Sequence, residues 1–330
     1  MKCFPRPTLL AGIKSLAMVA MVCGLAVDAN AQSMVVTVVV DDDFNDGSPV
    51  VSGDGSAAES RFFTTTSTGA LDDGITNTGV LDFASGTGGR GIHTIFAPQT
   101  LAAVGDRIDV EFTFNTPANI AGTPGDDFRY GLFDTSTSPG FSNTAENTLG
   151  FGGDIGASSG TPEAGLNIAG FSAEFDLNEA TADFQFRYND LATSTGRLLS
   201  STSAPAFPSI GSGTDSGSPV PSVPASTNGL VGTVGIEYLG GGQVELTTSY
   251  GGQSFTTTAN SADTGLTFDF LGFQNTSDAF GVSASNNEPN NGIDFDNVTV
   301  TFSTLAVVPE PSSLALLGLF GCAGFMRRRR

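Results

Sequence analysis

Two aspartate-rich stretches, one near each end of the chain, hold side chains that could bind a cation. The first reads Asp41-Asp42-Asp43-Phe44-Asn45-Asp46-Gly47, and the second reads Asn290-Asn291-Gly292-Ile293-Asp294-Phe295-Asp296-Asn297. Ca²⁺ takes about six to eight hard oxygen ligands, which two such segments could supply together with a carbonyl and water. The alternative is that these are solvated turn residues, where Asp and Asn are expected anyway. A structural calcium site therefore requires the two stretches to lie side by side.

A third group of carboxylates lies in the middle of the chain. It reads Glu174-Phe175-Asp176-Leu177-Asn178-Glu179. On a strand, Glu174 and Asp176 would share one face, and a bulge near Asn178 would be needed to return Glu179 to it. The group is a candidate catalytic site, and the alternative is an outer strand face with ordinary acidic residues.

The elements that would position these groups are short strands. No long segment has apolar residues at helical spacing, whereas β-branched and aromatic runs recur between turn residues. In Arg107 to Phe114, Ile108 and Val110 begin an apolar face while Asp109 and Glu111 lie on the other, as a half-buried antiparallel strand requires. The predicted strands are 34–40, 61–66, 80–84, 92–96, 107–114, 128–133, 168–177, 182–188, 230–239, 243–250, 253–258, 266–273 and 293–302.

Two polar stretches interrupt the strand pattern. Residues 134–167 are Gly-rich, and residues 201–228 are a Ser/Pro/Gly segment with five prolines. The second stretch could be an interdomain linker, but the strands after it are needed to complete one sandwich. We therefore expect one all-β domain over residues 32–304, an antiparallel β-sandwich in which the two stretches are long surface loops.

The terminal stretches resemble those of concanavalin A-like and laminin-G-like jelly rolls, in which a "DxF" opening strand runs beside an "(I/F)DN(V)" closing strand. Asp127-Phe128-Arg129-Tyr130-Gly131-Leu132-Phe133-Asp134 also resembles a strand common in exported proteins. In some carbohydrate-binding jelly rolls a structural calcium joins the terminal strands. The resemblance implies Asp43 and Asp296 as first ligands, with Asp41 and Asp294 next.

The Glu174 group is similar to the catalytic strand of laminarinase-type glycosidases. That resemblance implies Glu174 as nucleophile, Asp176 as helper and Glu179 as acid/base, in a retaining hydrolysis that needs its two carboxylates about 5–5.5 Å apart. Those enzymes surround the motif with tryptophans that stack on sugars, and this chain has no Trp. The expectation is therefore a protein that is not an enzyme, with the glycosidase as the alternative.

The N-terminal residues read as a secretory signal peptide over residues 1–31. Lys2, Arg6 and Lys14 precede an apolar segment, and Ala29-Asn30-Ala31 supplies the small-x-small pattern. Cleavage is expected between Ala31 and Gln32. The alternative, a first transmembrane helix, is disfavoured because the segment is short.

Charge and cysteine content limit the partners of the remaining body. Of 13 Lys and Arg residues, three lie in the leader and four at the C-terminus. The rest of the chain therefore has six Arg and 33 of the 34 acidic residues. A surface this acidic repels phosphate backbones, so no nucleic-acid partner is expected. The three cysteines lie in the leader and the C-terminal segment, so the core must hold the body without disulfides.

The last residues combine Pro309-Glu310-Pro311, an apolar run over residues 314–326 and four terminal arginines. The prolines stop any regular element, and the apolar run spans about 20 Å as a helix against a hydrocarbon layer of roughly 30 Å. Residues 305–330 resemble the PEP-CTERM sorting signal. The resemblance implies an exosortase-type processing enzyme as partner, transient anchoring in the inner membrane, and delivery to the cell surface or extracellular matrix. The alternative is an ordinary short anchor.

Together these features predict an exported, non-catalytic protein that contacts polysaccharide or has a structural role. The alternatives are the laminarinase-type hydrolase and a ligand-free spacer.

Overall fold

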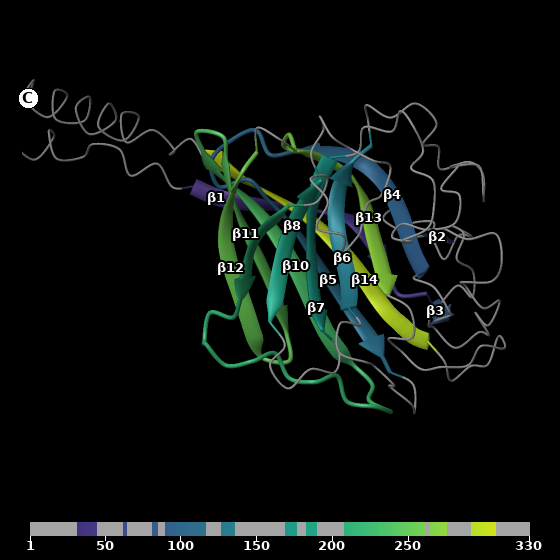
Figure 1. The fold of residues 1–330 in the computed structure, drawn as a ribbon. Helices are drawn as coiled ribbons and strands as arrows, with labels where there is room; N and C mark the ends of the chain where they lie inside the picture. The colour runs from purple at the N-terminus through teal and green to yellow at the C-terminus, as the bar shows by residue number, and fades with distance from the viewer. Residues whose placement is uncertain are drawn as a thin grey trace, which may run out of the picture. The chain divides into compact units, whose positions relative to one another are not determined.

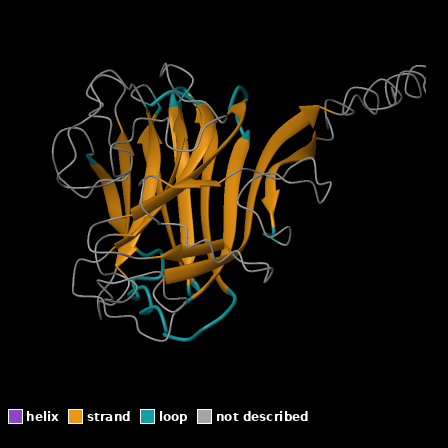
Figure 2. Cartoon of the chain, turned by 90° about the vertical axis from the view of Figure 1, so that its right-hand side faces the viewer, coloured by secondary structure: helices purple, strands orange, loops and turns teal. Residues whose placement is uncertain are grey.

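The computed structural model describes residues 32–44, 62–64, 81–84, 90–116, 127–135, 169–176, 183–189, 208–261, 264–275 and 292–307. These residues form strands, turns and loops (Figure 2). Within these ranges, no helix is long and apolar enough to span a membrane. The predicted leader and the Pro-Glu-Pro segment with its apolar run lie outside the described residues.

The described strands form two antiparallel sheets (Figure 1). The first, here sheet A, has the order β1 (Gln32–Asp42), β14 (Gly292–Val307), β5 (Arg107–Asn115), β10 (Leu230–Gly240), β11 (Gln243–Tyr250) and β12 (Gln253–Asn260), with β3 (Leu81–Ala84) also paired to β14. Sheet B has the order β2 (Phe62–Thr64), β4 (Arg90–Thr100), β13 (Thr267–Asn275), β6 (Asp127–Asp134), β7 (Ala169–Asp176), β8 (Phe184–Asn189) and β9 (Ser209–Gly213). The predicted all-β antiparallel sandwich is confirmed.

Alternation along the strands sets which side chains face the core. In β5, Ile108, Val110, Phe112 and Phe114 are all buried, and the residues between them are partly or fully exposed. The β10–β11 hairpin turns at Gly241 and Gly242, which have φ values of 64° and 80°. That left-handed backbone region favours glycine, so the Gly run closes the hairpin that the sequence predicted.

Aromatic rings fill the space between the two sheets. Phe112 of β5 contacts Phe128 and Tyr130 of β6 and Phe273 of β13, with ring centroids 4.9–5.8 Å apart. A hydroxyl pair also crosses this core, because the Tyr130 Oη and Thr248 Oγ1 atoms lie 2.5 Å apart. Since Thr248 donates its own proton to the Thr233 carbonyl, Tyr130 is the donor. Both sheets therefore share one core.

The structure corrects one expectation and confirms another. The Ser/Pro/Gly stretch 201–228 is not a surface loop throughout, because it contains β9, which pairs with β8 at the edge of sheet B. Ser and Gly side chains give such a strand no apolar alternation by which to recognise it. The first and last strands do lie side by side, as β1 and β14 of sheet A.

The chain divides into two compact units. One holds Val36–Thr304, and the other holds Met1–Val35 together with Leu305–Arg330. Strand residues at the start of β1 and at the end of β14 fall in the second unit.

The close packing of Phe112 against β10 yields a stability prediction. A Cβ atom added at Gly232 would lie 2.2 Å from Phe112 Cζ, so the ring occupies the space that a side chain would need. Gly232→Ala should lower the free energy of unfolding by about 1–3 kcal/mol in urea titrations, because overpacking strains the core. In a Phe112→Leu background the same change should cost much less; an equal cost in both backgrounds would contradict this account.

Candidate functional site

The described parts of the two terminal aspartate stretches lie at the end of β1 and at the start of β14, which are neighbouring strands. The Asp41 carboxylate accepts a hydrogen bond from Thr299 Oγ1 at 3.3 Å, and the buried Asp42 accepts one from the Phe44 amide at 3.0 Å. Asp296 lies at a β-bulge in β14, where it accepts a hydrogen bond from Asn115 Nδ2 at 2.7 Å. Desolvation by burial raises the pKa of Asp296, and the hydrogen bond from Asn115 opposes that rise.

The described residues include all four predicted calcium ligands, namely Asp41, Asp43, Asp294 and Asp296. Among the residues that the structure describes, no three His, Cys, Asp or Glu side chains gather in a group that could hold a metal ion. Calcium binding stays a prediction from the sequence.

Glu174 of β7 is bound by two arginines from the neighbouring strands. Its Oε2 accepts from Arg129 Nε of β6 and its Oε1 accepts from Arg187 Nε of β8, each at 2.8 Å. The Arg129 and Glu174 side chains are 3% and 10% exposed, so both charges lie out of contact with bulk water. Charge-assisted hydrogen bonds of this kind are what permits a carboxylate to be buried.

Asp176 and Glu179 are the other two members of the predicted catalytic group. Asp176 is the last residue of β7 and pairs in register with Asp127 of β6. Glu179 lies outside the described residues. The spacing of Glu174 from a second catalytic carboxylate therefore stays a prediction.

The face of sheet B that carries Glu174 is turned away from the core. A cross-strand row runs from Gln274 of β13 through Arg129 and Glu174 to Gln185 of β8. Gln274 is 1% exposed. On the same sheet, the buried ring of His93 stacks on Phe270 with centroids 4.9 Å apart. This face is a buried layer over β13, β6 and β7.

The outward face of sheet A has a different character. Two rows of residues, each paired across neighbouring strands, cross five strands of this sheet. All members of the rows except Gly235 are partly or fully exposed. One row is Thr299, Glu111, Thr233, Ser249 and Ser254, and the other is Thr301, Asp109, Gly235, Thr247 and Thr256. We call these two rows, with Arg107 and Glu237 beside them, the hydroxyl face.

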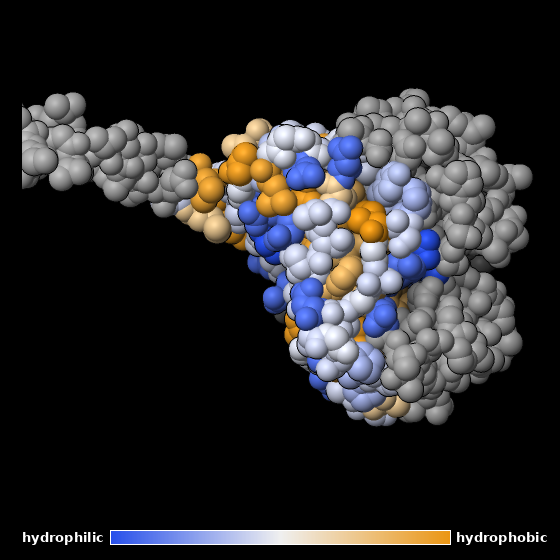
Figure 3. Space-filling view, turned by 60° about the vertical axis from the view of Figure 1, so that its left-hand side comes forward, coloured by the Kyte–Doolittle hydropathy of each residue, from blue (hydrophilic) through white to orange (hydrophobic). Residues whose placement is uncertain are grey.

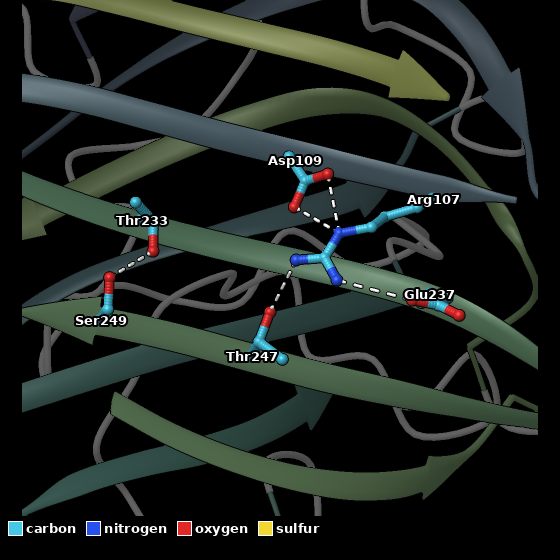
Figure 4. Close-up of polar contacts among 6 residues, drawn as sticks. All are labelled: Arg107, Asp109, Thr233, Glu237, Thr247 and Ser249. Atoms are coloured by element: carbon cyan, nitrogen blue, oxygen red, sulfur yellow. Dashed lines mark hydrogen bonds and ion pairs between the residues drawn. The ribbon is translucent and has the colours of Figure 1, made fainter. Parts of the chain in front are cut away.

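A four-residue polar cluster lies at the centre of the hydroxyl face (Figure 4). Arg107 Nε lies 2.7 Å from both Asp109 carboxylate oxygens, its Nη1 lies 3.5 Å from Glu237 Oε2, and its Nη2 donates to Thr247 Oγ1 at 3.1 Å. Desolvation by burial raises the pKa of Asp109, which the adjacent Arg107 opposes. Beside the cluster, Thr233 and Ser249 share a hydrogen bond at 2.7 Å.

The lack of a side chain at Gly235 makes room for this cluster. A Cβ atom there would lie 2.5 Å from Arg107 Nη2, 2.5 Å from an Asp109 oxygen and 2.7 Å from Thr247 Oγ1. The guanidinium can therefore lie flat across β10. Sequence reasoning missed this cluster and the two arginines on Glu174. The available signal was that six arginines in so acidic a body should all find carboxylates, but their partners depend on strand register.

Comparison with protein families finds the PEP-CTERM protein-sorting motif over residues 307–330. The predicted resemblance of the C-terminal segment to this sorting signal is thereby confirmed. The motif implies export with membrane-associated sorting. No curated protein matches the sequence.

Solved structures with a similar arrangement of strands include two lectins and a glucanase. A peanut lectin bound to a nine-residue peptide shares 14% identity with a TM-score of 0.43, covering 84% of this chain and 100% of the lectin. An endo-1,3-beta-glucanase from Streptomyces sioyaensis shares 14% identity with a TM-score of 0.46, covering 83% and 99%. Winged bean acidic lectin complexed with methyl-alpha-D-galactose shares 13% identity with a TM-score of 0.39, covering 83% and 100%.

The buried histidine gives a pH prediction. Burial lowers the pKa of His93 from 6.5 to about 3. Below pH 6.5 the unfolded chain therefore takes up a proton that the folded chain does not. The free energy of unfolding then decreases as the pH is lowered, until about pH 3. Between pH 7 and pH 5 this histidine should remove about 2 kcal/mol from the free energy of unfolding. His93→Phe should lose less stability than the wild type over that interval in urea titrations, and parallel pH curves would refute the assignment.

Proposed function

We propose that this chain is an exported, non-catalytic protein of the cell surface or extracellular matrix that contacts polysaccharide through the hydroxyl face. The sorting motif over residues 307–330 supports processing by an exosortase-type enzyme and delivery outside the cell. An enzymatic role requires an available carboxylate on sheet B, whereas a binding role requires an accessible polar surface such as that of sheet A.

The pairing of Glu174 with two arginines is the observation that carries the non-catalytic proposal. A glycosidase nucleophile must present a free carboxylate oxygen to the sugar. In this chain each oxygen of Glu174 accepts a hydrogen bond from a guanidinium at 2.8 Å. The side chain is also buried. These contacts favour a structural carboxylate that holds β6, β7 and β8 together.

The composition of the hydroxyl face supports polysaccharide contact. A hydroxyl group both donates and accepts hydrogen bonds, as the hydroxyls of a sugar chain do. Neighbouring strands place these groups about 4.8 Å apart, so the two rows offer a repeating set of contacts rather than one pocket. Such contacts are individually weak. Binding is therefore expected to depend on a long ligand that meets several rows at once.

The non-catalytic proposal predicts what happens when Glu174 is neutralised. Glu174→Gln removes the buried negative charge that both guanidiniums contact, and should lower the free energy of unfolding by about 3–5 kcal/mol. Glu111→Gln on the exposed surface of sheet A is the matched control and should change it by about 0.5 kcal/mol or less. Reducing-sugar release from β-glucans should be at background for the wild type. Hydrolysis by the wild type that Glu174→Gln abolishes would refute the proposal.

The binding role is tested on an array of immobilised polysaccharides. The wild type should bind one or more of them, and the double variant Thr233→Val with Thr247→Val should lose most of that signal, because it removes two central hydroxyls. The control is Thr100→Val with Thr267→Val, which removes a cross-strand hydroxyl pair from sheet B. Equal loss in both variants, or no binding by the wild type, would contradict polysaccharide contact and favour a ligand-free spacer.

A further inference from the structure

Four of the seven large apolar side chains that are exposed among the described residues lie toward one end of sheet A. They are Val36 and Val38 of β1, Val104 in the turn before β5, and Leu239 near the end of β10, with exposed fractions of 54%, 46%, 61% and 38%. We call these four residues the apolar end. Figure 3 shows hydrophobic surface toward one end of the described residues, with smaller hydrophobic spots elsewhere among polar and intermediate surface.

Strand register shows which end of the sheet this is. Ser303 of β14 pairs with Arg107 of β5, which pairs with Glu237 of β10. Val104 and Leu239 therefore lie just beyond this row, on the side toward which β14 continues from Ser303. Asp41 of β1 contacts Thr299 of β14, and the start of β1 falls in the same compact unit as the end of β14, so Val38 and Val36 lie toward that side as well. The apolar end is thus on the side of the sheet toward which β14 runs.

Three hydrogen bonds hold the turn that carries Val104. Asp106 Oδ2 accepts from the amides of Ala102 and Ala103 at 2.9 and 2.7 Å, and the Gly105 amide donates to the Tyr238 carbonyl at 2.8 Å. Val104 also packs beside Gly240, where a Cβ atom would lie 2.8 Å from Val104 Cγ2. These three hydrogen bonds fix the backbone around Val104, so its side chain is presented to the surroundings at the tip of the turn.

The chain leaves the sheet at this end by a short connection. Six residues, 308–313, separate Val307 from Leu314, the first residue of the apolar run. At about 3.5 Å per residue, the seven Cα steps from Val307 to Leu314 reach at most ~25 Å. Once residues 314–326 insert in a membrane, the last residue of β14 is therefore held within that distance of the bilayer.

We propose that the apolar end is a membrane-contact surface, which rests on the lipid bilayer while the chain is anchored by its C-terminal segment. Transfer of aliphatic side chains from water to the headgroup boundary is favourable. The short connection keeps the apolar end close to the bilayer, which makes this contact more frequent. The partner is a lipid surface rich in zwitterionic headgroups, because the acidic body is repelled by anionic lipid. This inference rests on membrane insertion of residues 314–326 and is independent of polysaccharide contact.

The test uses single cysteines labelled with an environment-sensitive fluorophore. The body has no cysteine, so the full chain with Cys3→Ser and Cys23→Ser keeps only Cys322, which lies inside the apolar run. Labelled Cys322 in vesicles of phosphatidylethanolamine and phosphatidylcholine reports insertion of the tail. Val104→Cys, with Cys322→Ser added, reports the apolar end. Val231→Cys in the same background is the matched control, an exposed valine on the same strand as Leu239 and about 25 Å away along it.

Three results are possible, and each decides the proposal. Lipids carrying a quencher should extinguish most of the fluorescence at positions 322 and 104 but little at position 231, with a blue-shifted emission at 104. Quenching at 322 with identical, water-like behaviour at 104 and 231 would overturn the membrane-contact surface while leaving the anchor intact. A lack of quenching at 322 would overturn the insertion on which the proposal rests. None of these results depends on the polysaccharide array.

Discussion

The packing of aromatic rings between two sheets is the constraint on which the rest of this protein depends. The three cysteines all fall in the predicted leader and the C-terminal segment, so the body between them has no disulfide to hold it. Phe112 and its neighbours on β6 and β13 supply the apolar burial, and Tyr130 joins the sheets through Thr248. Because each ring comes from an alternate strand position, the polar residues between them are forced onto the two outward faces. The properties of those faces follow from that division.

The two outward faces differ because one is buried and the other is not. On sheet B, burial means that each charge must be paired, and Glu174 between Arg129 and Arg187 meets this requirement. On sheet A, Arg107 and its two carboxylates remain about one third exposed, so their attraction is screened by water and adds little to stability. Their proposed use is instead as part of a polar surface. Thus the same types of side chain have a structural role on one sheet and a proposed binding role on the other.

Much of the fold follows from the sequence, and the reasons are local. Alternation in β5 and the glycines after β10 indicate strand and hairpin directly, because both are properties of adjacent residues. β9 escaped prediction since its Ser and Gly residues do not alternate in hydrophobicity. The partners of Glu174 also escaped it. They lie 45 and 13 residues away in sequence, and only the pairing of β6, β7 and β8 brings them together. A motif of three acidic residues does not contain that information.

The central claim is that Glu174 is a structural carboxylate rather than a nucleophile. The most direct measurement is labelling with an epoxyalkyl β-glucoside, which alkylates the nucleophilic carboxylate of retaining β-glucanases, followed by peptide mass spectrometry. Because both Glu174 oxygens are held by arginines, the peptide spanning β7 should remain unmodified at reagent concentrations that fully label a control glucanase. Stoichiometric modification of Glu174 would contradict the account.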